Sequence, residues 1–94
     1  MSELEKAVDI TLSGKVTGVG FRDWVRQIAG RIGVAGWVRN NTDGTVLAHV
    51  EGAGELIDQF IEKINYPDLP DAKVDSLSQN ETEPHGYVGF SIEY

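Results

Sequence analysis

A glycine-rich stretch that leads into an arginine is the first feature of this sequence that could carry chemistry. Residues 14–20 read Gly-Lys-Val-Thr-Gly-Val-Gly and continue through Phe21 to Arg22. Gly18 and Gly20 allow backbone N–H groups to turn toward one point, where an anion oxygen can approach closely. If a helix begins here, its unpaired N–H groups and its dipole add to the same anion site. The pattern indicates a phosphate-binding loop, or alternatively a tight connection between a strand and a helix.

Arg22 would stand in the first turn of that helix, where a cation faces the positive end of the dipole. This placement is unfavourable unless an anion lies beside it, and a guanidinium can hold two phosphate oxygens in a fork. The alternative is a surface arginine that pairs with a carboxylate and covers apolar surface with its stem.

Asn40 is predicted to reach the same place because of the lengths of two elements. A helix from Arg22 to about Gly33 descends about 18 Å, and an extended segment over residues 34–40 returns by about 23 Å. Asn40 then lies beside the loop and faces the helices, whereas Asn41 points the opposite way. A carboxamide there could hold a water in line with a bound phosphorus. Alternatively, both asparagines are simply turn residues.

Two periodicities alternate along the chain and predict the order of its elements. Alternating apolar residues predict half-buried strands, and apolar residues at helical spacing predict amphipathic helices. Glycine and proline residues separate them, including a tight turn over residues 41–44. The predicted strands cover residues 7–13, 34–40, 46–51, 73–77 and 87–94, and the predicted helices cover residues 22–33 and 56–64.

This order is β-α-β-β-α-β with the final strand region split in two. Right-handed crossovers then predict an α+β ferredoxin-like sandwich, in which an antiparallel sheet carries both helices on one face. Because proteins of many functions share this arrangement, the function must be argued from the site.

The composition limits the classes of protein to which the chain can belong. Its 94 residues suit a single domain spanning residues 1–94. The absence of cysteine excludes disulfides, thiolate ligands and a cysteine nucleophile, and favours a reducing compartment. Residues 1–7 contain no apolar run, and no segment is long enough to span a bilayer. We therefore expect a cytoplasmic protein with no membrane partner.

The charge is unevenly distributed. The net charge of −7 argues against nucleic acid or an anionic membrane as a partner. Of the eight basic residues, five lie between positions 15 and 39, where Asp23 is the only acid. This segment suits the capture of one small anion, although a solvated basic helix face is the alternative. An acidic surface without an obvious apolar stripe favours a monomer.

Neither a metal nor a cofactor is predicted. His49 and His85 belong to different segments without metal-ligand spacing, and we interpret each as a surface or strand residue. The stretch Gly18-Val19-Gly20-Phe21-Arg22-Asp23 lacks the third glycine of a dinucleotide fingerprint. No Gly-Lys-Ser or Gly-Lys-Thr follows for a nucleotide phosphate loop.

The chain resembles the acylphosphatase family in the order and spacing of its motifs. The resemblance implies the ferredoxin-like fold and an enzyme that hydrolyses small acyl phosphates to a carboxylate and inorganic phosphate. It also implies that Arg22 binds the phosphate and that Asn40 positions the attacking water. The resemblance extends over essentially the whole chain, and the segments that carry it are residues 14–22, Gly36-Trp37-Val38-Arg39-Asn40, Asp43-Gly44-Thr45-Val46 and Glu51-Gly52. The implied phosphate-binding residues are Val16, Thr17, Gly18, Val19, Gly20, Phe21 and Arg22.

Two loop positions depart from the usual family pattern, with Lys15 in place of arginine and Thr17 in place of glutamine. Because both lie outside the catalytic matches, we expect them to affect loop stability and affinity more than activity. A carboxylate leaving group, with a pKa of about 4, needs no general acid. Without cysteine or an Asp-x-Asp motif for a covalent intermediate, direct attack by water is left.

Two other classes of protein would share this fold. An RNA-binding domain would need aromatic residues on the open sheet face, where the sequence instead predicts polar side chains such as Asp9, His49 and Glu51. A phosphate sensor without activity, or a domain like the N-terminal one of carbamoyl-transferring hydrogenase-maturation proteins, would keep the fold alone. The presence of both Arg22 and Asn40 in a short chain favours the enzyme.

Overall fold

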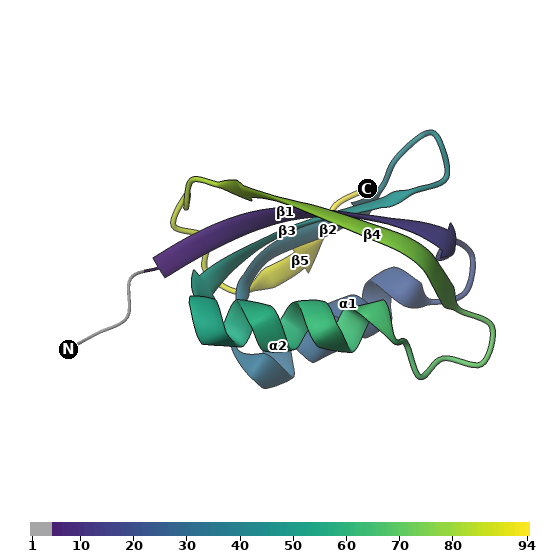
Figure 1. Cartoon of the computed structure of the whole chain (residues 1–94), viewed down its shortest axis with the longest axis horizontal. Coiled ribbons are helices and arrows are strands. Elements are labelled where there is room, and N and C mark those ends of the chain that lie inside the picture. The colour runs from purple at the N-terminus through teal and green to yellow at the C-terminus, as the bar shows by residue number, and fades with distance from the viewer. Residues whose placement is uncertain (1–4) are drawn as a thin grey trace.

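The computed structural model describes residues 5–94 as one sheet with two helices packed against it (Figure 1). Residues 1–4, which belong to the predicted domain, lie outside the described residues. No helix of the described part of the chain is long and apolar enough to cross a membrane. The elements in order are β1 (Glu5–Lys15), α1 (Phe21–Ile32), β2 (Ala35–Asn40), β3 (Val46–Ala53), α2 (Gly54–Asn65), β4 (Lys73–Thr82) and β5 (Phe90–Ile92).

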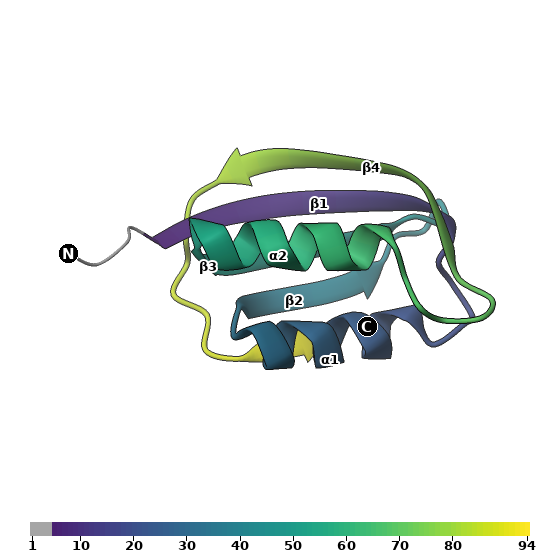
Figure 2. The same ribbon diagram turned by 60° about the horizontal axis from the view of Figure 1, so that its bottom comes forward.

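Both helices cover one face of the sheet, as Figure 2 shows, so the predicted α+β ferredoxin-like architecture is confirmed. The strand order is β4-β1-β3-β2-β5. The prediction of a wholly antiparallel sheet is wrong, because β5 pairs with β2 in parallel. β4 ends at the end of the sheet where β2 begins, and the chain crosses there to the opposite edge. It then runs back beside β2 in the same direction.

The last two strands differ from their predicted bounds. β4 continues to Thr82, beyond the predicted end at residue 77, and β5 is shorter than the predicted strand over residues 87–94. Tyr87 is not in the sheet because its backbone N–H donates to the Glu51 side chain instead of a neighbouring strand. Val88, in the predicted strand over residues 87–94, lies outside β5 and is fully exposed.

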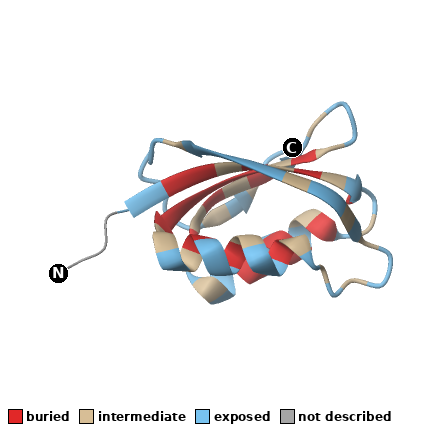
Figure 3. Ribbon diagram, in the orientation of Figure 1, coloured by how far each residue is buried: buried red, intermediate tan, exposed pale blue. Residues whose placement is uncertain are grey.

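The core lies between the sheet and the helices, and Figure 3 shows buried positions on the strands and on both helices. The first strand follows its predicted alternation, with Ile10 and Leu12 fully buried. Both helices bury one apolar stripe, as their spacing predicts. The helix residues buried in the core are Phe21, Trp24, Val25, Ile28 and Ala29 of α1, and Ile57, Phe60 and Ile64 of α2.

Candidate active site

A small hollow of about 230 Å³ lies where the loop after β1 meets the beginning of α1 and the end of β2. These segments are far apart in sequence. The sheet brings them together because β1 and β2 lie on either side of β3. The lining residues are Val16, Thr17, Gly18, Gly20, Phe21, Arg22, Asp23, Asn40, Ile92 and Tyr94.

Residues 16–18 and 20–22 of the loop and of the first turn of α1 line this hollow. Gly18 and Gly20 have φ of 71° and 77°, in the left-handed region that favours glycine. Gly20 is also the N-cap of α1, and no side chain caps this end of the helix. Within residues 5–94, the N–H groups of residues 17–20 donate no hydrogen bond to a backbone carbonyl. The first-turn N–H groups and the helix dipole therefore face the hollow and favour an anion.

Arg22 enters the hollow from the second position of α1 and is half-buried. Its guanidinium carbon lies 5.1 Å from the centroid of the Tyr94 ring. Within residues 5–94, no carboxylate lies at ion-pair distance from Arg22, so the guanidinium keeps its donors for another acceptor. The geometry thus favours the anion-binding interpretation over a surface ion pair for Arg22.

Asp23 is the one acidic residue that lines the hollow. Its carboxylate accepts hydrogen bonds from Arg26 at 2.6 Å and from Gln27 at 2.8 Å, one turn further along α1. The hydrogen bond from Arg26, followed by that from Gln27, lowers the pKa of Asp23. The negative charge of Asp23 is therefore offset by Arg26 at the mouth of the anion site.

Asn40 and Asn41 separate as the alternation of the strand predicts. Asn40, the last residue of β2, lines the hollow together with Arg22. Asn41 instead belongs to the turn, where its side chain donates to the Thr45 hydroxyl at 2.9 Å and its N–H to the Thr45 carbonyl at 2.8 Å. Of these two asparagines, only Asn40 has a carboxamide available to contact a ligand in the hollow.

Some residues of the predicted phosphate loop do not line the hollow with their side chains. Val19 packs against the core, and Phe21 lines the hollow but is almost fully buried beside Trp24. Their contribution can come only from the backbone. Lys15, which ends β1, is exposed and does not line the hollow.

Sequence reasoning missed three lining residues, namely Asp23, Ile92 and Tyr94. Asp23 is adjacent to Arg22, so its position was a usable signal. Ile92 and Tyr94 come from the end of the chain and reach the site only because β5 pairs with β2. No periodicity in the sequence identifies that pairing.

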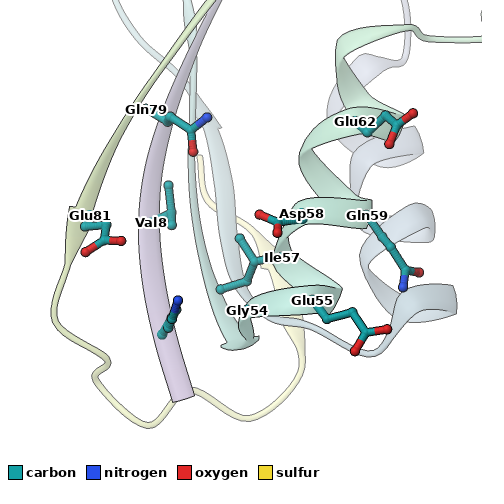
Figure 4. A pocket seen from close by; sticks show the side chains of 10 residues that line it. Val8, Gly54, Glu55, Ile57, Asp58, Gln59, Glu62, Gln79 and Glu81 are labelled. Atoms are coloured by element: carbon teal, nitrogen blue, oxygen red, sulfur yellow. The ribbon is translucent and has the colours of Figure 1, made fainter. Parts of the chain in front are cut away.

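A second hollow, of about 560 Å³, lies between α2 and the strands β1 and β4 (Figure 4). Carboxylates dominate its charged lining, and Lys6 is its only cation. Because carboxylates repel a phosphate, this larger hollow is a poor anion site. Its charged residues are Lys6, Glu55, Asp58, Glu62 and Glu81.

The outer face of the sheet differs from the prediction of an open polar surface. His49 and Glu51 are only 3% and 2% exposed, because residues 85–87 fold over them. The interpretation of His49 as a strand residue is right, since it lies in β3, but it is not at the surface. Within residues 5–94, no group of three or more His, Cys, Asp or Glu side chains is arranged to hold a metal ion.

The sequence and the fold are both similar to those of known proteins. The family model named Acylphosphatase matches residues 8–92. An acylphosphatase of Haloquadratum walsbyi is 42% identical over 92 residues, which cover 98% of this chain and 98% of that protein. The crystal structure of the Bacillus subtilis acylphosphatase is 36% identical with a TM-score of 0.91, and the match covers 95% of this chain and 99% of that one.

Structures of the much longer protein HypF also match. HypF from T. kodakarensis is 38% identical with a TM-score of 0.82, but the match covers 95% of this chain and only 12% of HypF. The matches with the acylphosphatases, in contrast, cover nearly the whole length of both chains. Since the family model matches residues 8–92 and the relatives agree over nearly their whole length, the chain belongs to the acylphosphatase family.

Proposed function

We propose that this protein hydrolyses small acyl phosphates to a carboxylate and inorganic phosphate. One observation carries the proposal: Arg22, Asn40 and the uncapped N-terminus of α1 surround a single hollow of about 230 Å³. Membership of the acylphosphatase family supports the same activity. The hollow is small, so the phosphoryl group would occupy it and the acyl group would extend outward.

The reaction requires little from the protein beyond positioning and charge. A water oxygen forms a bond to phosphorus while the bond from phosphorus to the acyl oxygen breaks, and its electron pair leaves with the carboxylate. Because the conjugate acid of that leaving group has a pKa of about 4, it departs without a proton. The proton of the attacking water passes to the phosphate product or to solvent. Among the lining residues, none is required as a general acid.

Arg22 and the loop would hold the phosphoryl oxygens. Backbone N–H groups of residues 17–22 supply donors fixed by the loop, and the guanidinium adds a charged fork. Such preorganised donors stabilise charge on the equatorial oxygens in a loose transition state. Asp23 does not oppose this, because its carboxylate is paired with Arg26.

Asn40 would position the water. Its carboxamide has an acceptor oxygen and two N–H donors, so it can bind a water and a phosphate oxygen at once. Since Asn40 lines the hollow from the end of β2, its carboxamide would hold the attacking water beside the phosphoryl group bound by the loop.

Hydrolysis of benzoyl phosphate in water labelled with oxygen-18 tests this proposal directly. Attack at phosphorus places the label in inorganic phosphate, whereas attack at the carbonyl carbon places it in benzoate. Phenyl phosphate is the matched control, because its phenol leaving group has a pKa near 10 and does not depart unprotonated. We expect the enzyme to release labelled phosphate from the first compound and to leave the second intact.

Label in benzoate would contradict the roles of Arg22 and Asn40. Equal hydrolysis of both compounds would imply a general acid that the proposal lacks. Binding of phosphate without any hydrolysis would instead favour the phosphate sensor.

A further inference from the structure

The face of the sheet opposite the helices carries a buried cluster of charged side chains. The proposed reaction does not use this cluster. His49 of β3 lies between two carboxylates, with Nδ1 at 2.7 Å from Asp9 Oδ1 and Nε2 at 2.7 Å from Glu51 Oε2. A neutral imidazole has only one N–H, so both contacts can be hydrogen bonds only if the ring is protonated. The imidazolium then links β1 to β3 across paired positions.

The Glu51 carboxylate is almost fully occupied by donors. Besides His49, it accepts the backbone N–H of His85 at 2.5 Å, of Gly86 at 3.0 Å and of Tyr87 at 3.2 Å. We call this set of contacts the Glu51 clamp. Its neighbours in register are Ala7 and Ala35, and these small side chains leave room for the backbone of residues 85–87 to reach the carboxylate.

The segment held by the clamp leads directly into β5, whose Phe90 and Ile92 pack against the core. β5 has three residues and pairs with β2 alone. Backbone hydrogen bonds flank it, from Gly36 N–H to the Gly89 carbonyl at 2.9 Å and from Glu93 N–H to the Val38 carbonyl at 2.8 Å. A strand this short depends on how its entry is fixed, and the clamp lies two residues before Gly89.

β5 in turn delivers the end of the chain to the anion hollow. Ile92 and Tyr94 both line that hollow, and the Tyr94 ring lies beneath the Arg22 guanidinium. Residues 85–94 thereby connect Glu51, on one face of the sheet, to Arg22, on the other face.

We propose that Glu51 is a positioning residue: its buried carboxylate clamps residues 85–87 and thereby sets the place of β5 and of Tyr94 beside Arg22. The effect on phosphate binding rests on the proposed function of the hollow. The clamp itself is independent of that function and can be observed without any ligand.

The test replaces Glu51 by glutamine, which keeps the shape and removes two of the four acceptor sites with the charge. In the amide N–H spectrum without ligand, we expect the signals of residues 85–94 and of Arg22 to shift, and the exchange of the three clamped amides to become faster. With benzoyl phosphate, KM and the inhibition constant of inorganic phosphate should both rise about threefold to tenfold, while kcat changes less than about twofold.

Glu81→Gln is the matched control, since Glu81 is an exposed carboxylate on β4 that lines the acidic hollow. It should leave the spectrum of residues 85–94 and both constants unchanged. If Glu51→Gln does not fold, Glu51→Asp withdraws the carboxylate by one methylene and should give the same shifts at smaller amplitude.

A double-mutant cycle separates positioning from a purely structural role. In a Tyr94→Ala background, Glu51→Gln should no longer raise the inhibition constant of phosphate, because its effect passes through Tyr94. A folded Glu51 variant with unshifted signals in residues 90–94 and an unchanged phosphate constant would overturn the proposal. If the unmodified enzyme does not hydrolyse benzoyl phosphate, the proposed function fails, and the spectra still decide whether the clamp exists.

Discussion

The phosphate loop and the Glu51 clamp both bring polar groups together. The two regions differ in the hydrogen-bond partners of those groups. In the loop, the N–H groups of residues 17–20 donate to no backbone carbonyl of the described residues, and Thr17, Gly18 and Gly20 line a hollow. In the clamp, His49 and Glu51 are buried, and each polar atom has a partner within the protein. Donors that remain available indicate a ligand, whereas a closed network indicates structure. Substitutions should therefore affect activity most strongly in the first region and stability most strongly in the second.

The largest expected effect belongs to Asn40. Because its carboxamide would hold water rather than substrate, Asn40→Ala should lower kcat about 10²-fold to 10³-fold and leave inhibition by inorganic phosphate nearly unchanged. Asn41→Ala is the control, since Asn41 bonds only within the turn. Steady-state kinetics on benzoyl phosphate measure both. Normal turnover by the Asn40 variant would show that water is positioned by another group.

Arg22→Lys should cost about 10²-fold in kcat/KM, because an ammonium cannot reproduce the planar fork of a guanidinium. Its stability to urea should change by less than about 0.5 kcal/mol, as for other partly exposed substitutions. Kinetics and urea unfolding of the same preparation measure the two quantities. A large loss of stability with little loss of activity would place Arg22 among the structural residues.

The reverse pattern is expected for the clamp. Glu51→Gln removes one partner of a buried charged network and should lower the free energy of unfolding by about 2–4 kcal/mol, which a domain of this size can tolerate. Urea unfolding measures the loss, with Glu81→Gln as the exposed control. A change below about 0.5 kcal/mol would mean that the clamp contributes nothing measurable.

The clamp should also make stability depend on pH. Burial alone would lower the pKa of His49, but its hydrogen bonds to Glu51 and then Asp9 outweigh burial and raise that pKa above the ordinary value. The stabilisation by His49 is therefore fully present below its unfolded pKa of about 6.5 and is lost as the pH rises through the higher folded pKa.

Glu51 acts in the opposite direction. Burial by itself would raise its pKa, but hydrogen bonds from His49 and from the backbone of His85, Tyr87 and Gly86 lower it. Its stabilisation is present above the unfolded pKa and is lost as the pH falls through the lower folded pKa. Together the two groups predict greatest stability in mildly acidic solution.

Urea midpoints between about pH 5 and 9 in a His85→Gln background measure this dependence, because His49 is then the only histidine. The groups that face His49 are Asp9 on β1, Glu51 on β3, Trp37 on β2 and Tyr87 on the covering segment. A midpoint that stays constant from pH 6 to 9 would show that folding does not raise the pKa of His49.

Removal of divalent ions should have the smallest effect. Since the proposed site uses backbone donors and Arg22 instead of a metal, exhaustive treatment with EDTA should leave kcat/KM within about twofold of the untreated enzyme. Loss of activity that magnesium restores would contradict this prediction.

The sequence by itself determined the features that depend on neighbouring residues. Alternation placed Ile10 and Leu12 in the core, helical spacing placed Phe21 and Ile28 there, and strand alternation separated Asn40 from Asn41. Each of these follows from the period of side chains along one element, which the chain carries locally. The glycine loop, Arg22 and Asn40 could therefore be predicted as neighbours before the structure was known.

Only the tertiary structure decided what the end of the chain does. The parallel pairing of β5 with β2, the burial of Glu51 under residues 85–87 and the arrival of Tyr94 at Arg22 join residues more than 30 positions apart. The sequence predicts His49 and Glu51 as polar residues on an open sheet face, because no local pattern indicates that a distant segment will cover them. A buried carboxylate gains its stability from donors that come from elsewhere in the chain, and those donors exist only once the chain has folded.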